Sequence, residues 1–349
     1  MPGTRALVID QSDAHIPSIN QYKIPGGNLM KAAVYYETGS PDVFKYEDVP
    51  DPKCHEQGVI IRVEAVSIEG GDSLSRAAGV LATTPHIVGY QAAGEIIEVG
   101  SEVTHLKPGQ RVTTVDAFGS HAELRPVPAR NCWLVPDGMD IKLAAAIPVP
   151  FGTADDCLFE YGHLKKGETV LIQAGAGAVG LAAIQLAKRA GATVIATAGS
   201  AEKLERLKEF GVDHGINYRE QDLVAEVKKF TDNRGVDVVV DPVGGSTLQK
   251  SILCLAYKGR VSSVGRAGRE GMNVDVSTMM GGNQSLSGVF LGMEIFSDRV
   301  HDMIQAHVDD VATGKLKVVL DEEFPLKDAA AAHARIEARK AFGRVLLIP

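Results

Sequence analysis

The stretch VLIQAGAGAVG, residues 170–180, decides the fold class of this chain. It joins a short apolar strand to an amphipathic helix through a G-x-G-x-x-G pattern, which is weak evidence outside that context. Gly175 permits the tight turn, Gly177 lets backbone N–H groups approach a pyrophosphate, and Gly180 lets the helix pack closely on the strand. The free N–H groups and the helix dipole then hold the anion. The stretch predicts a dinucleotide site, and the alternative is a glycine-rich turn without a ligand.

The residues around this stretch alternate between short β-branched runs and helices with one apolar face. This alternation is typical of an α/β fold with a parallel, doubly wound sheet. We predict strands over residues 169–173, 192–197, 237–241 and 260–265, and helices over residues 178–189, 201–210 and 247–257.

The chain before residue 150 is rich in β-strand patterns instead. Its short strands are separated by Gly and Pro turns, which predicts a compact, barrel-like domain. A helix over residues 328–339 and a strand over residues 344–348 are expected to return to that domain. Residues 1–30 show neither periodicity, and we expect a loosely ordered arm there. The strands predicted for the first domain are residues 31–36, 59–66, 94–99 and 111–115.

Composition limits the kind of protein this can be. The chain has 349 residues, of which 45% are hydrophobic and 23% charged, and this suits two globular domains. Its net charge of −8 gives no reason to expect binding to nucleic acid or to an anionic membrane. Neither a membrane-spanning run nor a secretory signal is recognisable, so we predict a cytoplasmic protein without a membrane partner. Its four cysteines are scattered, which argues against a disulfide framework.

The end of the second predicted strand indicates which dinucleotide binds. An NAD site has Asp or Glu there to bind the ribose hydroxyls, but this chain reads TAGS over residues 197–200. Gly199 leaves room for a 2′-phosphate, Ser200 can donate a hydrogen bond, and Lys203 lies one turn into the next helix. We therefore predict NADPH as the cofactor. The alternative is that Ser200 only caps the helix and Lys203 is a solvated surface lysine.

Several separated blocks together resemble the medium-chain dehydrogenase/reductase superfamily, on its zinc-free quinone oxidoreductase branch. The resemblance implies a GroES-like catalytic domain over residues 31–152 and 292–349, preceded by the arm over residues 1–30. It also implies a Rossmann NADP-binding domain over residues 153–291, with NADPH in the cleft between the domains. The matching blocks are residues 88–112, 144–154, 173–211, 236–245, 259–265, 285–292 and the closing GRVLLIP.

The resemblance assigns cofactor-binding positions residue by residue. The coenzyme loop matches at Ala174, Gly177 and Gly180, with Ala178 and Val179 at its variable positions. Around the 2′-phosphate and the nicotinamide, the matches are Ser200 and Lys203, Tyr218 beside the phosphate, and Thr153 near the ring. On the adenosine side the matches are Asp241 and Gly244, at the carboxamide edge they are Gly265 and Phe290, and Arg344 is a basic residue near the coenzyme. The full expected set is Thr153, Ala174, Gly175, Gly177, Ala178, Val179, Gly180, Gly199, Ser200, Lys203, Tyr218, Asp241, Gly244, Gly265, Phe290 and Arg344.

Two of these assignments have plain structural alternatives. Tyr218 sits at the end of a strand and can equally belong to the core. Arg344 can equally be a surface arginine.

The zinc-ligand positions of the superfamily carry other residues in this chain. Zinc-dependent members hold the metal with a cysteine, a His-Glu pair and a later Cys or Asp, but here the corresponding stretches read SIEGGD (67–72) and GYQ (89–91). Tyr90 and Gln91 cannot replace His and Glu as ligands. We therefore expect no metal. Without a Lewis acid, the oxidation of a simple alcohol is poorly supported. The hydride acceptor should instead be a quinone or a conjugated carbonyl.

The catalytic candidates are Glu69, Tyr90 and Thr153. Glu69 stands where the family often has asparagine, and it can relay a proton if burial raises its pKa. The alternative is that Glu69 pairs with Arg76 or faces solvent. Tyr90 can donate to a substrate carbonyl or simply pack in the core.

The predicted function is NADPH-dependent hydride transfer to a small-molecule quinone or enone without zinc. A 2-alkenal or enoyl reductase and a non-catalytic NADPH-binding protein are the alternatives. The resemblance also implies a homodimer formed by pairing of the strand around residues 285–290.

Overall fold

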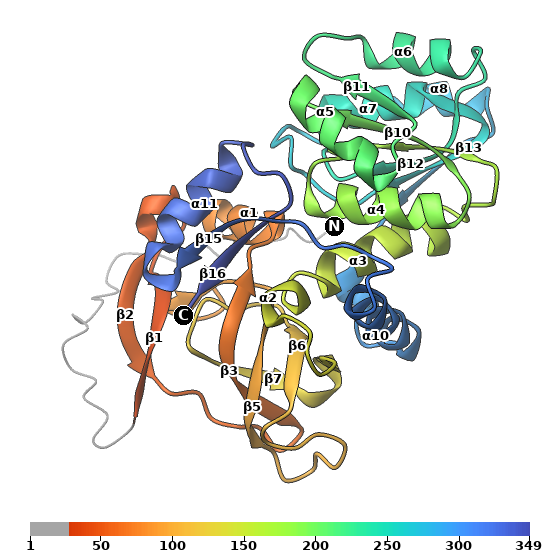
Figure 1. Ribbon diagram of the computed structural model, residues 1–349. Helices are drawn as coiled ribbons and strands as arrows, with labels where there is room; N and C mark the ends of the chain where they lie inside the picture. The colour runs from red at the N-terminus through yellow and green to blue at the C-terminus, as the bar shows by residue number, and fades with distance from the viewer. Residues whose placement is uncertain (1–27) are drawn as a thin grey trace, which may run out of the picture.

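The computed structural model describes residues 28–349 of the chain (Figure 1). Most of the arm expected over residues 1–30 lies outside the described residues. Leu29 and Met30, however, already belong to strand β1 (Leu29–Tyr35), so the first strand begins earlier than predicted. Met30 is buried in a small cluster with Val34 and Val49, and this contact extends the strand.

A six-stranded parallel sheet forms the upper part of the molecule in Figure 1. Its strands follow the order β11-β10-β9-β12-β13-β14, so the chain builds outward from β9 in one direction and then from β12 in the other. This order confirms the α/β fold with a doubly wound sheet, and ligands of such sheets bind where the order reverses. The strands are β9 (Thr169–Ile172), β10 (Thr193–Ala198), β11 (His214–Asn217), β12 (Val236–Asp241), β13 (Leu255–Ser263) and β14 (Ser285–Gly288).

Helices cover both faces of this sheet because successive side chains of each strand point to opposite faces. In β9, Val170 and Ile172 belong to the apolar cluster that includes α4, whereas Leu171 belongs to the cluster that includes α6 and α7. The apolar runs in the sequence are explained by this two-sided burial. The helices are α4 (Ala178–Arg189), α5 (Ala201–Leu207), α6 (Leu223–Phe230), α7 (Gly245–Leu253) and α8 (Ser277–Met280), with a 3-10 turn at Lys208–Phe210.

The remaining strands form the β-rich part of the molecule. A seven-stranded sheet has the order β15-β16-β3-β5-β6-β8, with β7 paired to β3, and a three-stranded sheet has the order β2-β1-β4. The C-terminal strand β16 pairs antiparallel with β3, which confirms the predicted return of the tail. These strands are β2 (Lys45–Pro50), β3 (Gly58–Ser67), β4 (His86–Ile87), β5 (Gln91–Val99), β6 (Arg111–Val115), β7 (Leu124–Pro128), β8 (Cys132–Leu134), β15 (Leu320–Pro325) and β16 (Arg344–Ile348).

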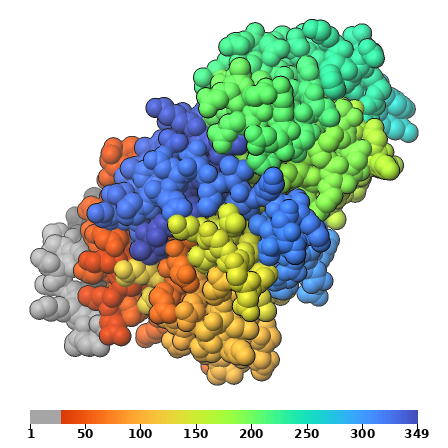
Figure 2. All heavy atoms as spheres, in the orientation of Figure 1, coloured from red at the N-terminus to blue at the C-terminus, as the bar shows by residue number. Residues whose placement is uncertain are grey.

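Helix α3 (Pro148–Asp155) joins the two parts, since it contacts α4 of the doubly wound part and β6 of the β-rich part. Figure 2 shows the C-terminal residues, in blue, lying against both the orange β-rich part and the green doubly wound part. Helix α3 packs on α4 and runs across residues 152 and 153, where a domain boundary was expected, and the domain limits stay a prediction. The remaining helices are α1 (Gly70–Ala78), α2 (Ile141–Ala144), α3 (Pro148–Asp155), α9 (Leu291–Glu294), α10 (Asp298–Ala312) and α11 (Ala329–Glu337), with a π turn at Asp156–Glu160 and 3-10 turns at Pro41–Val43, Ala129–Asn131 and Leu326–Asp328.

One predicted helix extends too far at its C-terminal end. Helix α7 ends at Leu253, and Leu255 opens strand β13 by pairing with Val236. The apolar run here suits either element, and the partner strand decides between them. Among residues 28–349, no helix is both long enough and apolar enough to cross a membrane.

Candidate active site

The glycine loop follows β9 and is fastened to the end of β10. The amide N–H of Ala174 donates to Thr197 Oγ1 at 3.1 Å, and that of Gly175 donates to the Thr197 carbonyl at 2.8 Å. The N–H of Gly177 donates to the Ala174 carbonyl at 2.9 Å. These three amides are thus engaged within the protein. A helix leaves its first N–H groups without a partner in the helix, so the first turn of α4, Ala178 to Gly180, offers the groups for an anion.

Two glycines of the loop differ in the space around them. A Cβ at Gly180 would lie 2.5 Å from the Ala174 carbonyl oxygen and 2.7 Å from the Cα of Gly175, so the helix packs closely on the loop, as we expected. A Cβ at Gly177 would meet only the Ala174 oxygen, at 3.3 Å. The surface at Gly177 is therefore open to a ligand.

Lys203 is held by the C-terminal part of the chain. Ser200 caps α5 by accepting a hydrogen bond from the Lys203 amide at 3.3 Å. The Lys203 ammonium donates to the Ala341 carbonyl at 2.7 Å and to the Arg339 carbonyl at 3.1 Å. The alternative of a solvated surface lysine is therefore wrong. Burial lowers the pKa of Lys203.

Gly199 lies beneath two side chains rather than beneath open space. A Cβ at Gly199 would lie 2.8 Å from the Tyr218 hydroxyl and 3.2 Å from Nε of Arg219. The room expected above Gly199 is thus taken by these residues, which only a glycine lets approach so closely. The sequence reading missed Arg219, although it directly follows Tyr218 and could have been noticed as a second cation beside Lys203.

Asp241 is at the end of β12, the strand that neighbours β9 on the side away from β10, and its side chain is buried. It is fully buried, and its Oδ1 accepts hydrogen bonds from the amides of Val243 at 2.8 Å and Gly244 at 2.9 Å. Gly265 packs on this loop, because a Cβ there would lie 2.4 Å from the Pro242 carbonyl oxygen. Asp241 therefore shapes the loop and does not itself line a cleft.

Thr153 and Phe290, two of the residues expected at the nicotinamide end, differ in exposure. Thr153 is buried within α3. Phe290 precedes α9 and is 65% exposed.

Glu69 is the centre of a buried ion pair. The guanidinium of Arg344 donates through two of its nitrogens to the Glu69 carboxylate, with Nη1 3.1 Å from Oε2, and through Nε to the Ser67 hydroxyl at 2.7 Å. Gln91 donates its amide N–H to the same carboxylate and accepts from the Val149 amide at 3.0 Å. Glu69 is 5% and Arg344 6% exposed.

This pair corrects three alternatives. Glu69 neither faces solvent nor pairs with Arg76, which binds Glu337 instead. Arg344 is not a surface arginine, because its guanidinium is enclosed by the residues after β3.

A second buried carboxylate holds the backbone around Glu69. Asp72 accepts hydrogen bonds from the amide of Glu69 at 2.8 Å and from that of Tyr90 at 3.2 Å. Burial raises the pKa of Asp72 to about 7. Burial also raises the pKa of Glu69, against the charge and hydrogen bonds of Arg344 and the hydrogen bond from Gln91. The two catalytic candidates Glu69 and Tyr90 are thus fixed by one carboxylate.

Tyr90 lies against the first turn of α1. Its ring covers Gly71, where a Cβ would lie 2.4 Å from Cε2, and its hydroxyl is 3.3 Å from that of Ser75. Burial raises the pKa of Tyr90, so its hydroxyl stays protonated at neutral pH. The half-buried ring packs as the core alternative requires, while the hydroxyl can still donate a proton.

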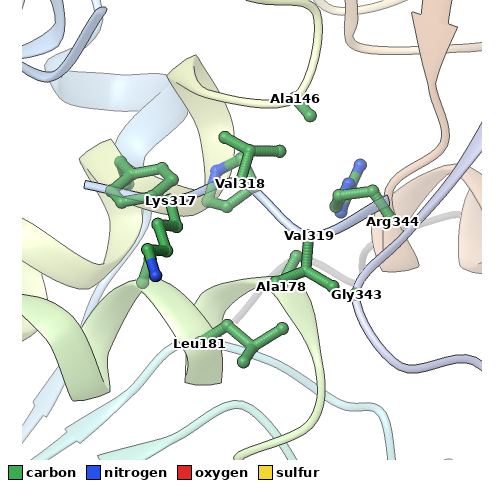
Figure 3. Close-up of a pocket in the computed structure, with 11 residues that line it drawn as sticks. Ala146, Ala178, Leu181, Lys317, Val318, Val319, Gly343 and Arg344 are labelled. Carbon is green, nitrogen blue, oxygen red and sulfur yellow. The ribbon is translucent and has the colours of Figure 1, made fainter. Parts of the chain in front are cut away.

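A small cavity brings the glycine loop and the ion pair together (Figure 3). Ala178, at the start of α4, and Arg344, which binds Glu69, both line it. Gly343 also lines it and donates its N–H to the Ala176 carbonyl at 3.0 Å. The cavity has a volume of about 10 Å³, enough for roughly one water molecule.

Comparisons with known proteins identify the family. Residues 178–308 match the family model described as zinc-binding dehydrogenase, and residues 55–137 match the alcohol dehydrogenase GroES-like domain. A 2-haloacrylate reductase from Burkholderia sp. is 33% identical over 331 residues, covering 92% of this chain and 99% of the relative. Human quinone oxidoreductase is 30% identical over 334 residues, covering 93% and 99%.

The chain belongs to the medium-chain dehydrogenase/reductase superfamily, on its quinone oxidoreductase-like branch. Among solved structures, Escherichia coli quinone oxidoreductase complexed with NADPH has a TM-score of 0.87 and 30% identity, covering 91% of this chain and 100% of that one. The expected GroES-like domain and parallel-sheet Rossmann domain of this branch are thereby confirmed.

The stretches that correspond to the zinc-ligand positions of the superfamily hold Glu69, Tyr90 and Gln91 in this quinone oxidoreductase-like protein. Glu69 accepts hydrogen bonds from Arg344 and Gln91, and the ring of Tyr90 packs against α1. Over residues 28–349, no group of three or more His, Cys, Asp or Glu side chains is placed to hold a metal ion.

Proposed function

We propose that the chain is a zinc-independent, NADPH-dependent reductase that transfers a hydride to a quinone or to the β-carbon of a conjugated carbonyl. The observation that carries this proposal is the shared cavity, whose walls are the start of α4 on one side and Arg344 on the other. A coenzyme that binds its diphosphate at α4 would extend its nicotinamide toward the Glu69–Arg344 pair. The similarity to quinone oxidoreductases supports the reaction class.

The residues present suit a phosphorylated coenzyme. The first-turn amides of α4 suit the diphosphate. Tyr218 and Arg219 lie beside Gly199, and Lys203 is in the first turn of α5. These side chains suit the 2′-phosphate, for which charge-assisted hydrogen bonds are strong. No carboxylate stands at the end of β10 to repel that phosphate.

The nicotinamide end would be held by the remaining predicted positions. Thr153 on α3 and Gly265 and Phe290 after β13 and β14 are assigned to it by the family resemblance. We assign five further residues to the coenzyme: Ala174, Gly175 and Gly177 in the glycine loop, Val179 in the first turn of α4 and Gly244 in the loop after β12.

The position of Glu69 favours chemistry without zinc. The negative charge of Glu69 is already paired with the Arg344 guanidinium, and a positive charge so close opposes the binding of a zinc ion. Tyr90 is protonated and Gln91 is uncharged, so neither supplies the charge that a zinc site needs.

When bound, NADPH supplies the hydride, and the side chains around it hold the acceptor and provide a proton. Tyr90 is the better proton donor, because its side chain is only partly buried and its hydroxyl stays protonated. Glu69 can relay a proton only if Arg344 releases a carboxylate oxygen, so we assign it to orienting Arg344 and Gln91. Holding the two reactants face to face supplies much of the rate enhancement.

The test is the oxidation of NADPH, followed by absorbance, with a panel of quinones and 2-alkenals. We expect turnover with at least one acceptor, and a lower turnover number for Tyr90→Phe at unchanged coenzyme affinity. Tight NADPH binding without turnover on any acceptor would refute the enzymatic proposal and favour the non-catalytic alternative.

The similarity to 2-haloacrylate reductase favours an alkene reductase as the second candidate. Turnover of conjugated alkenes together with inactivity toward quinones would select that function.

We also propose a homodimer. Strand β14 ends the order of the six-stranded sheet, and the residues after it include the exposed Met293 and Phe296. An edge that pairs with no other strand of residues 28–349, beside apolar side chains, suits pairing with a second copy. Met293→Asp should convert a dimer to a monomer in analytical ultracentrifugation, while Val80→Asp, at an exposed position in the other domain, should not. A monomeric wild-type protein would refute the dimer.

A further inference from the structure

A continuous chain of buried hydrogen bonds runs beneath the glycine loop. The Ala174 amide donates to Thr197 Oγ1 at 3.1 Å, and the Thr197 hydroxyl donates to Gln173 Oε1 at 2.9 Å. Gln173 Nε2 then donates to Ser251 Oγ at 3.0 Å, and the Ser251 hydroxyl donates to Asp241 Oδ2 at 2.7 Å. The four side chains are at most 2% exposed. The chain crosses the sheet where its strand order reverses, from β10 through β9 to β12.

We propose that Thr197, Gln173 and Ser251 are positioning residues that fix the shape of the glycine loop before the coenzyme binds and join it to the loop at Gly244. This inference rests on the proposed placement of NADPH at the glycine loop. None of the three side chains has to touch the coenzyme for this role.

The carboxylate of Asp241 gives the chain a single direction. A carboxylate only accepts hydrogen bonds. The Ser251 hydroxyl must therefore donate its hydrogen bond to Asp241 and accept one from Gln173. This fixes the amide of Gln173 with its oxygen toward Thr197, which must donate there. The Thr197 oxygen is then left to accept from the Ala174 N–H. Each hydrogen bond in this network thus has one possible donor, and the Ala174 N–H of the glycine loop has Thr197 Oγ1 as its acceptor.

Both ends of the chain hold unusual backbone. Ala174 has a φ of +52°, a left-handed conformation that costs energy for a residue with a side chain. Gly244 has a φ of +73°, and its amide donates to the other oxygen of Asp241 at 2.9 Å. The hydrogen-bond network therefore stabilises the unusual backbone conformations of two loops, the one at Ala174 and the one at Gly244.

Ser251→Ala tests the proposal, with Ser262→Ala as the matched control. Both hydroxyls are fully buried at the same sheet, and that of Ser262 donates to the Cys157 carbonyl at 2.8 Å, outside the chain. We expect Ser251→Ala to raise the Kd of both NADPH and NADH about three- to tenfold, as one lost hydrogen bond would. The KM of the acceptor and the preference for NADPH should not change. Equal coenzyme affinities for the two variants would overturn the proposal.

Thr197 provides a rescue experiment. Thr197→Val keeps the shape but removes the hydroxyl, whereas Thr197→Ser keeps the hydroxyl. We expect weaker coenzyme binding only for Thr197→Val. The same loss in both variants would show that packing, and not the hydrogen bond to Ala174, matters.

A measurement without coenzyme separates this inference from the proposed function. Hydrogen–deuterium exchange of residues 173–180 should be at least about threefold faster in Ser251→Ala than in Ser262→Ala. If the wild type bound no NADPH, the proposed function would fail while this comparison would still decide whether the chain fixes the loop. Equal exchange in the two variants would refute the inference even if NADPH binds.

Discussion

Gly177→Ala is the substitution that best separates binding from folding. Gly177 caps α4 with a φ of −80° and a ψ of 168°, a conformation that alanine adopts without strain. The added Cβ would meet only the Ala174 carbonyl oxygen, at 3.3 Å. We expect the free energy of unfolding to change by no more than about 1 kcal/mol, the usual cost of alanine at a helix cap.

The same methyl group would lie where a diphosphate must approach the first turn of α4. Moving the anion away loses a charge-assisted hydrogen bond, and one such bond contributes about 1.5–3 kcal/mol. The Kd of NADPH should therefore rise about ten- to hundredfold. NADH should lose as much, because it carries the same diphosphate.

Fluorescence titration of the two coenzymes and urea unfolding give the two quantities. Gly281→Ala is the control, since a Cβ at Gly281 meets nothing within 4 Å and the residue lies away from the loop. Gly177→Ala protein that folds normally and binds NADPH as the wild type does would refute a diphosphate site at α4.

Three further outcomes follow from the side chains around the loop. Lys203→Ala should raise the Kd of NADPH about tenfold or more, as loss of a hydrogen bond to a charged phosphate does, and leave NADH nearly unchanged; equal losses would contradict the 2′-phosphate assignment. Glu69→Gln leaves Arg344 buried without its counter-charge and should lower the free energy of unfolding by about 3 kcal/mol. Adding Arg344→Met should recover part of that loss, and additive effects of the two substitutions in urea unfolding would argue against the pair. Burial lowers the pKa of His121 to about 3 and that of His333 well below its usual value. Below about pH 6.5 the unfolded chain therefore binds more protons than the folded chain. As the pH is lowered through this range, the free energy of unfolding should decrease by up to about 1.4 kcal/mol per pH unit for each histidine. Replacing both histidines with glutamine should remove that slope, and an unchanged slope would contradict neutral, buried histidines.

Local patterns predicted much of the fold. Helix α4 runs from Ala178 to Arg189 and strand β16 from Arg344 to Ile348, as the sequence indicated, because both follow from the spacing of apolar residues and a glycine at the cap or turn. The start of β13 at Leu255 was missed, because its pairing with Val236 is a tertiary contact that the local pattern does not contain.

The site was predicted in its residues more than in its contacts. Glu69 and Arg344 were both identified, but they lie 275 positions apart, and nothing local to either indicates that they pair. Lys203 was identified as a cation near the coenzyme, yet its carbonyl partners are 136 and 138 positions away. Such partners depend on how the last strand returns to the first domain.

The most direct test of the central claim is calorimetric titration of NADPH into wild-type protein treated with a metal chelator. We expect saturable heat corresponding to one coenzyme per chain, with much weaker heat from NADH. A titration without saturable NADPH binding would contradict a coenzyme site at the start of α4.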